Sequence, residues 1–181
     1  MRRPETSEHD SYYSTYIDKV PDRPVIEVLA EAPGELELLL NSLSPSEESY
    51  AYGPDKWSIR EALGHVTDTE RVFSYRALHM ARGDASAVPG MDQDVWATAS
   101  NASERPIARL LAEFRALRTA NVELFSSFDD AVLDRRGVAS GVEFSVRALV
   151  FIVAGHELHH RAIFSERYLT GLGNTDAVSD G

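Results

Sequence analysis

Apolar residues recur three and four positions apart along four stretches of the chain, which is the spacing of amphipathic helices. The first stretch covers about Val25 to Leu43. Pro33-Gly34 interrupts it, so this helix is expected either to bend there or to begin there. The second stretch begins at Ser58, which stands three residues before Glu61 in the pattern of a capping box, and it continues to about residue 82.

The third helix is predicted from about residue 103 to residue 128, and the fourth from about Val142 to Leu169, with a turn at Gly137–Gly141 between them. Inward positions of the fourth helix, again three and four apart, are Val146, Leu149, Val153, His156, His160, Ile163 and Arg167. No β-branched alternation of period two occurs, so no strand is predicted. Four amphipathic helices joined by modest loops predict an all-α fold, a four-helix bundle.

The ends of the chain differ from this central region. Residues 1–24 are polar and carry tyrosines and prolines, which predicts an irregular N-terminal arm, and residues 171–181 lack periodicity, which predicts a short disordered C-terminal tail. The bundle is therefore assigned to residues 25–170. A length of 181 residues suits one such domain.

Composition narrows the classes of function. The chain has 18 Lys and Arg against 29 Asp and Glu, a formal net charge of −11, which disfavours binding to nucleic acid or to an anionic membrane surface. It has no cysteine, which excludes disulfides, thiolate ligands and cysteine nucleophiles. No apolar run approaches the ~20 residues that span a bilayer, and the N-terminus lacks the apolar segment of a signal peptide. A cytoplasmic protein is expected.

Two histidines interrupt the apolar face of the fourth helix. His156 and His160 are four residues apart, so their rings project from adjacent turns in the same direction. Buried imidazoles require polar partners or a metal ion. His65, beside the apolar line of the second helix, supplies a third imidazole if the two helices pack together. Three imidazoles leaving an open position suit Zn²⁺, Ni²⁺, Fe²⁺ or Co²⁺ better than Mg²⁺ or Ca²⁺.

The remaining histidines are weaker candidates. His79 lies fourteen residues beyond His65, about 21 Å along a helix, so the two cannot share a metal. His159 points about a hundred degrees away from His160, which favours a surface or supporting position. His9 lies in the N-terminal arm and indicates nothing.

Residues 156–160 also match the H-E-x-x-H pattern of zinc proteases, in which the glutamate is the general base. The extended form of that pattern requires Gly at position 163 and His at position 166, where this chain has Ile163 and Glu166. A protease cleft usually lies beside a strand, and none is predicted. The protease interpretation is therefore the weaker one. Glu157 could still act as a base or orient a ligand, but its angle from the inward positions favours the surface.

Several segments carry a family resemblance: KWSIREALGHVTDTERVFSYRALHMARGD, PGMDQDVW, LLAEFRALR and SVRALVFIVAGHELHHRAIFSERYL. Together they resemble the DinB/YfiT-like superfamily of metal-binding four-helix bundles, over about Val25 to Leu169. The Trp-Ser-x-x-Glu-x-x-x-His block combined with a late His-x-x-x-His is more specific than either part alone.

The resemblance implies a divalent metal, Zn²⁺ or Ni²⁺, bound by His65, His156 and His160. It also implies a metal-dependent enzyme acting on a small-molecule substrate, either a hydrolase or a thiol S-transferase that uses a low-molecular-weight thiol such as mycothiol or bacillithiol. A homodimer is expected on the same basis. With no cysteine in the chain, the sulfur of a transferase must come from that thiol cosubstrate.

Other residues have two interpretations each. Asp68 and Glu70 are close enough to His65 to accept an imidazole N–H, yet Asp68 and Arg76 also fit a solvated helix face. Asp92 and Asn121 are also candidates for pocket roles, although Asn121 fits a register-setting core position as well. Trp57, Tyr75 and Trp96 could line a pocket mouth, but aromatic residues at helix ends more often serve packing. At the level of function, the alternatives to an enzyme are a metal-dependent binding or stress-response protein and a bundle whose histidines are structural.

Overall fold

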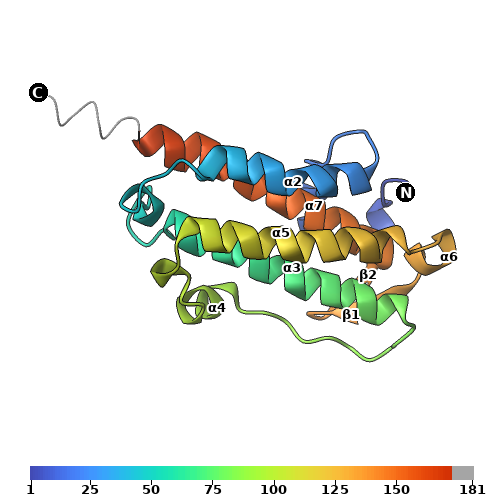
Figure 1. Cartoon of the computed structure of the whole chain (residues 1–181). Helices are drawn as coiled ribbons and strands as arrows, with labels where there is room; N and C mark the ends of the chain where they lie inside the picture. The colour runs from blue at the N-terminus through green and yellow to red at the C-terminus, as the bar shows by residue number, and fades with distance from the viewer. Residues whose placement is uncertain (173–181) are drawn as a thin grey trace, which may run out of the picture.

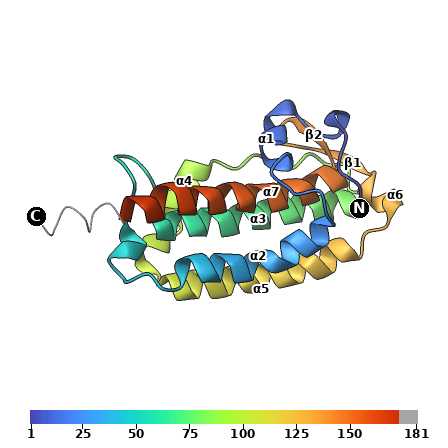
Figure 2. The ribbon, with the colours of Figure 1, turned by 90° about the horizontal axis from the view of Figure 1, so that it is seen from above.

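Four long helices form the body of the protein in the computed structural model, which describes residues 1–172 (Figure 1). They are α2 (Val25–Leu40), α3 (Ile59–Ala81), α5 (Ile107–Ser126) and α7 (Val146–Ile163). Helix α3 packs on α7 and α5, and α2 packs on the same two helices from the other side. Seen from above, the α3–α7 pair lies beside the α2–α5 pair (Figure 2). The predicted all-α four-helix bundle is confirmed.

Shorter elements occupy the connections and the N-terminal arm. Residues 1–24, predicted to be irregular, contain two 3₁₀ turns (Thr6–Glu8 and Ser11–Tyr13) and a single helical turn, α1 (Ser14–Ile17), which packs against α7. The remaining short elements are 3₁₀ turns at Glu47–Ser49 and Ala102–Glu104 and the helices α4 (Gln93–Ala99) and α6 (Asp130–Leu133). Within residues 1–172 no helix combines the length and the apolar character that crossing a membrane requires. From residue 173 onward the predicted tail lies outside the described residues.

The prediction that the chain has no strand is wrong. Strands β1 (Arg136–Ala139) and β2 (Val142–Ser145) form an antiparallel hairpin. Its two-residue turn, Ser140 and Gly141, has φ values of +54° and +77°, the backbone of a tight hairpin turn. Strands of four residues are too short to show a clear period-two pattern, which explains why the sequence did not predict them.

Helix α7 also differs from its prediction at both ends. The hairpin delays its start from residue 142 to Val146, where the side chain of Ser145 caps the helix by accepting a hydrogen bond from the Ala148 amide. At the other end, Phe164–Leu169 form a π-helix, whose wider turns change the phase of the side chains. Phe164 and Tyr168 are therefore buried, whereas the predicted inward residue Arg167 is exposed.

Helix α2 runs through Pro33 without ending, and Arg118 shows why this is possible. A proline has no N–H, so Pro33 cannot donate to the carbonyl of Leu29 one turn earlier. Nη1 of Arg118, from α5, lies 3.1 Å from that carbonyl and donates the replacement hydrogen bond. A residue of another helix thus satisfies the group that the proline leaves without a partner.

The hydrophobic core is divided into two clusters. One surrounds Phe73, Phe125 and Phe144 near the hairpin and the N-terminal arm, and the other surrounds Leu63 and Phe114 near the opposite end of the bundle. Between them lies a buried polar layer, consisting of His65, Thr69, Glu70, Arg118, Asn121, His156 and Glu157. Buried polar groups need partners, so this layer is where the chemistry of the protein is concentrated.

Candidate metal centre and its two pockets

Three histidines from neighbouring helices meet in the polar layer. His65 lies on α3, and His156 and His160 lie one turn apart on α7. Nε2 of His65 is 3.3 Å from Nε2 of His156. One ring nitrogen of each of the three lies within 4.8 Å of those of the other two. The structure therefore brings together the three residues that the spacing selected, which are called the histidine triad below.

Local structure fixes the positions of these rings. At the start of α3, Ser58 and Glu61 form the predicted capping box, in which the Glu61 carboxylate accepts a hydrogen bond of 2.8 Å from the Ser58 amide. On α7, Gly155 allows the N-terminal arm to approach, since a Cβ atom there would lie 2.0 Å from the carbonyl oxygen of Tyr16. The ring of Tyr16 consequently sits edge-on to His156, with 5.3 Å between ring centroids.

Burial keeps the triad uncharged. Loss of solvent lowers the pKa of His65 to about 4 and that of His160 to about 3. The pKa of His156 falls well below 6.5, first because of burial and then because of the neighbouring histidines. At neutral pH the three rings are therefore neutral imidazoles, which is the form that binds a metal ion.

Few other groups compete for the ring nitrogens. Oγ1 of Thr69 lies 3.4 Å from Nδ1 of His65, a contact suited to fixing the tautomer of that ring. His160 forms no hydrogen bond with any residue in the described part of the chain. Three neutral nitrogen donors in reach of one point match the ligand preferences of Zn²⁺ and Ni²⁺. The residues present therefore fit a transition-metal ion.

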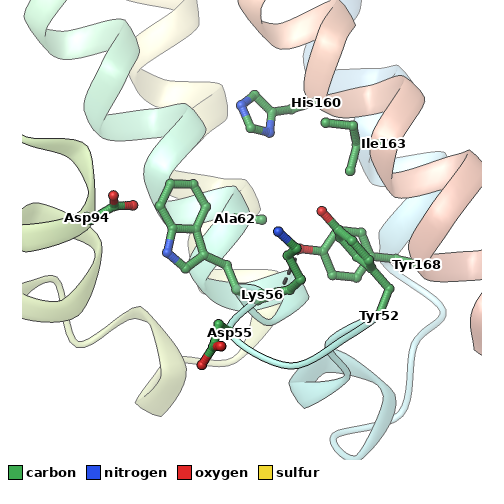
Figure 3. A pocket seen from close by; sticks show the side chains of 9 residues that line it. Tyr52, Asp55, Lys56, Ala62, Asp94, His160, Ile163 and Tyr168 are labelled. Carbon is green, nitrogen blue, oxygen red and sulfur yellow. Dashed lines mark hydrogen bonds between the residues drawn. The ribbon is translucent and has the colours of Figure 1, made fainter.

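A first pocket of about 230 Å³ opens at His160. In Figure 3, His160 and Ile163 project from one helix toward the loop that carries Tyr52 and Lys56. This space, called the Lys56 pocket, is lined by Tyr52, Asp55, Lys56, Trp57, Ala62, Asp94, His160, Ile163 and Tyr168. The Trp57 ring also packs against His65 at a centroid distance of 4.6 Å, so the pocket wall reaches a second member of the triad.

A second pocket, of about 160 Å³, opens at the other two histidines. It lies between α3, the N-terminal arm, the segment before α4 and the turn of the hairpin. This space, called the Arg76 pocket, is lined by Tyr12, Tyr13, Tyr16, His65, Thr69, Phe73, Arg76, Met91, Gln93, Ser140 and His156. Arg76 is not a solvated surface residue, because only 2% of it is exposed. Each member of the triad therefore lines at least one open pocket.

The two glutamates of the polar layer, Glu70 and Glu157, do not lie where the sequence predicted them. Glu70 does not bind a histidine. Its carboxylate accepts hydrogen bonds from Nε and Nη2 of Arg118, both at 2.8 Å, and from the Asn121 amide at 3.0 Å. Glu157 is not at the surface, since only 1% of it is exposed. Within the described part of the chain its oxygens accept no hydrogen bond, and Nε of Arg161 lies 3.5 Å from Oε1. Because α7 is covered by α3, α2 and the arm, a residue turned away from the triad is still inside the protein.

The other candidates lie outside the triad or at its margin. Asp68 pairs with Arg71 at 3.3 Å, and Asp92 caps α4. Trp96 and Tyr75 are exposed. The ring of His159 is half-buried against Tyr16, while His79 lies beside Ser86 and Asp84 at the far end of α3. Nδ1 of His9 lies 2.9 Å from the carbonyl oxygen of Asp10, in the N-terminal arm.

Several residues of the site were not predicted, and three of them show why. Thr69, Tyr16 and Lys56 contact the triad or line its pockets, yet each has an ordinary sequence context. Thr69 stands four residues after His65, so helical spacing alone was a usable signal for it. Tyr16 and Lys56 reach the site only through the folding of the arm and of a loop, for which the sequence offers no periodic pattern.

Comparisons with known proteins concern the family and the fold of the chain. Residues 29–164 match the family model of the DinB superfamily. A protein of Oceanobacillus iheyensis named "Putative metal-dependent hydrolase OB0413" is 29% identical over 153 residues, covering 80% of this chain and 87% of the relative. The structure of YfiT from Bacillus subtilis, described as a probable metal-dependent hydrolase with an unusual four-helix bundle topology, superimposes with a TM-score of 0.74 at 17% identity. The match covers 84% of this chain and 95% of YfiT.

Proposed function

The chain belongs to the DinB superfamily, and on that basis we propose that it is a divalent-metal-dependent enzyme acting on small molecules. His65, His156 and His160 are the proposed ligands, and Zn²⁺ or Ni²⁺ is the proposed ion. The observation that carries the proposal is the approach of three neutral imidazole nitrogens to within 4.8 Å of one another. The names of the relatives, which refer to metal-dependent hydrolysis, support the same class of activity.

When bound, such an ion polarises an electrophile and lowers the pKa of a water molecule or a thiol. The chain's own residues have separate tasks. Thr69 orients His65, while Tyr16 and Trp57 pack on the triad and limit the access of water. The two pockets provide the space for reactants beside the histidines.

The open pockets favour an enzyme over a binding protein whose metal is closed off. A structural site has no need of cavities that reach its ligands from solvent. They also argue against the H-E-x-x-H protease, because Glu157 lines neither of the two and a general base must reach its substrate. Hydrolase and thiol S-transferase remain the two candidate reactions. Homodimerisation and a cytoplasmic location stay predictions.

Metal analysis of the purified protein tests the proposal. We expect about one equivalent of Zn²⁺ or Ni²⁺ by mass spectrometry, lost in His160→Ala and His65→Ala. The control is His79→Ala, which removes an imidazole from the same α3 helix and should leave the metal content unchanged. Far-UV circular dichroism should show that all three variants remain helical. Full metal content in His160→Ala would refute the assignment.

A second measurement separates the two reactions. Metal-loaded protein is incubated with activated esters or with alkyl halides, in the presence and absence of bacillithiol or mycothiol. Product that forms without thiol indicates a hydrolase, whereas a thioether product that requires thiol indicates a transferase. Turnover that survives in His160→Ala would show that the triad is not involved.

A further inference from the structure

Among the most deeply buried arginines of the described chain, Arg76 differs from the others in having no ion pair with a carboxylate. Arg76, Arg118 and Arg147 are each no more than 2% exposed. Arg118 pairs with Glu70 at 2.8 Å, and Arg147 pairs with Glu8 at 3.0 Å. No carboxylate of residues 1–172 lies within ion-pair distance of Arg76. Arg76 thus lacks the carboxylate partner that Arg118 and Arg147 have, although acidic residues are in excess and the net charge of the protein is −11.

The contacts of Arg76 leave much of its hydrogen-bonding capacity unused. Nη2 donates to the carbonyl of Pro89 at 3.2 Å and to Oγ of Ser140 at 2.8 Å. Among residues 1–172, the buried Nε has no hydrogen-bond partner and Nη1 donates to no acceptor. The guanidinium lies 4.8 Å from the centre of the Phe73 ring. An arginine has five N–H donors, and a buried charge without a paired anion is costly.

The surroundings of Arg76 supply no hidden counter-ion. The phenol of Tyr13 interacts electrostatically with Arg76, but burial raises the pKa of this phenol, so it stays neutral. The other walls are aromatic, neutral or polar side chains from the arm, α3 and the hairpin turn. His65 and His156 line the same pocket. A ligand in this pocket is therefore in reach of both the free cation and two members of the triad.

We propose that the Arg76 pocket binds the carboxylate or phosphate group of an anionic small molecule, with Arg76 as its counter-ion. This inference rests on the proposed function, because it assigns the anionic end of the reactant to this pocket beside the triad. A planar guanidinium matches an oxyanion of either kind through paired N–H donors. The tyrosines of the arm and Phe73 provide an apolar wall for the rest of the molecule.

Binding to chelator-treated, full-length protein tests the inference without involving the metal. Isothermal titration calorimetry at pH 7.5 compares benzoate, phenyl phosphate and the neutral benzamide. We expect saturable binding of at least one anion at one site per chain, and at least about tenfold weaker binding of benzamide. Tighter binding of benzoate assigns the site to carboxylates, and tighter binding of phenyl phosphate assigns it to phosphates.

Two substitutions that each remove one positive charge test whether Arg76 binds the anion. Arg76→Gln should weaken the better anion at least about tenfold, whereas Arg82→Gln, at the exposed end of α3, should change its affinity less than twofold. Arg76→Lys keeps the charge but loses the planar donor pair, so it should also weaken binding of the anion. This variant replaces Arg76→Gln in the test if the glutamine variant does not fold. Failure of both anions to bind the wild type, or equal affinity in the Arg76 variants, would overturn the inference.

The same variants separate this inference from the proposed function. Arg76→Gln should retain the metal content of the wild type, since Arg76 is not a ligand. If His160→Ala keeps its metal while anion binding still depends on Arg76, the proposed metal site fails and the anion site stands. If the triad variants lose metal but Arg76→Gln binds the anions normally, only the anion site fails.

Discussion

Nε2 of His65 lies 3.3 Å from Nε2 of His156, although 91 positions separate the two residues in the sequence. At this distance one neutral ring can donate a hydrogen bond to the other, or both can face a shared cation. Two protonated rings would instead place positive charges in contact inside the protein. Protonation of these two rings therefore opposes both metal binding and folding.

Metal-free protein should lose stability in mild acid because of the triad. The folded-state pKa is about 4 for His65 and about 3 for His160, whereas an unfolded histidine titrates near 6.5. Between about pH 6.5 and pH 4 the unfolded chain thus binds more protons than the folded one. The free energy of unfolding should fall as pH is lowered through this range, as measured by urea denaturation after chelation.

The variant His160→Ala should show a shallower dependence on pH over the same range, because one buried imidazole is gone. His9→Ala removes a histidine that belongs to the N-terminal arm and should keep the slope of the wild type. Equal slopes for the wild type and His160→Ala between pH 6.5 and pH 4 would contradict the predicted burial of the triad.

Glu157 should have the opposite pH dependence. Burial raises its pKa to about 7, against 4.5 for an unfolded glutamate. Between about pH 4.5 and pH 7 the folded protein holds a proton that the unfolded chain has released, so this carboxyl destabilises the fold increasingly as pH rises. Glu157→Gln lacks this effect, so its stability relative to wild type should increase from pH 5 to pH 7. The exposed substitution Glu166→Gln should show no such trend, and a matching trend there would contradict the prediction.

Gly155 should tolerate no side chain. A methyl group at this position would fall 2.0 Å from the carbonyl oxygen of Tyr16, so Gly155→Ala must displace the arm or α7. We expect a loss of about 1–3 kcal/mol in the free energy of unfolding and faster amide exchange around Tyr16. Gly34→Ala is the matched control, because nothing lies within 4 Å of its added Cβ and alanine favours a helix. Equal stabilities of the two variants would show that the arm does not pack as described.

Two arginines on α5 should differ sharply in their contribution to stability. Arg118→Ala leaves Glu70 buried without its ion pair and the Leu29 carbonyl without its donor, so a loss of about 3–5 kcal/mol is expected. Arg115→Ala removes an exposed pair with Glu37, for which a much smaller loss is expected because solvent screens the two charges. Chemical denaturation measures the free energy of unfolding of both variants. Similar losses in the two would contradict the burial of the Arg118–Glu70 pair.

Much of the fold followed from local pattern. The three-and-four spacing of apolar residues predicted the four long helices, and the capping box placed the start of α3 correctly. The hairpin and the π-helical end of α7 were not predicted. Strands of four residues carry too little pattern, and a π turn changes the phase of a helix without an evident signal in composition.

The sequence by itself determined that His156 and His160 share one face of a helix, because that relationship depends only on the helical repeat. It also selected His65, through the apolar line beside which that residue lies. Tertiary structure alone decided that Arg118 pairs with Glu70 while Arg76 pairs with no carboxylate of the described chain. A charge acquires its partner from segments distant in sequence, so its pairing is set by packing rather than by local spacing.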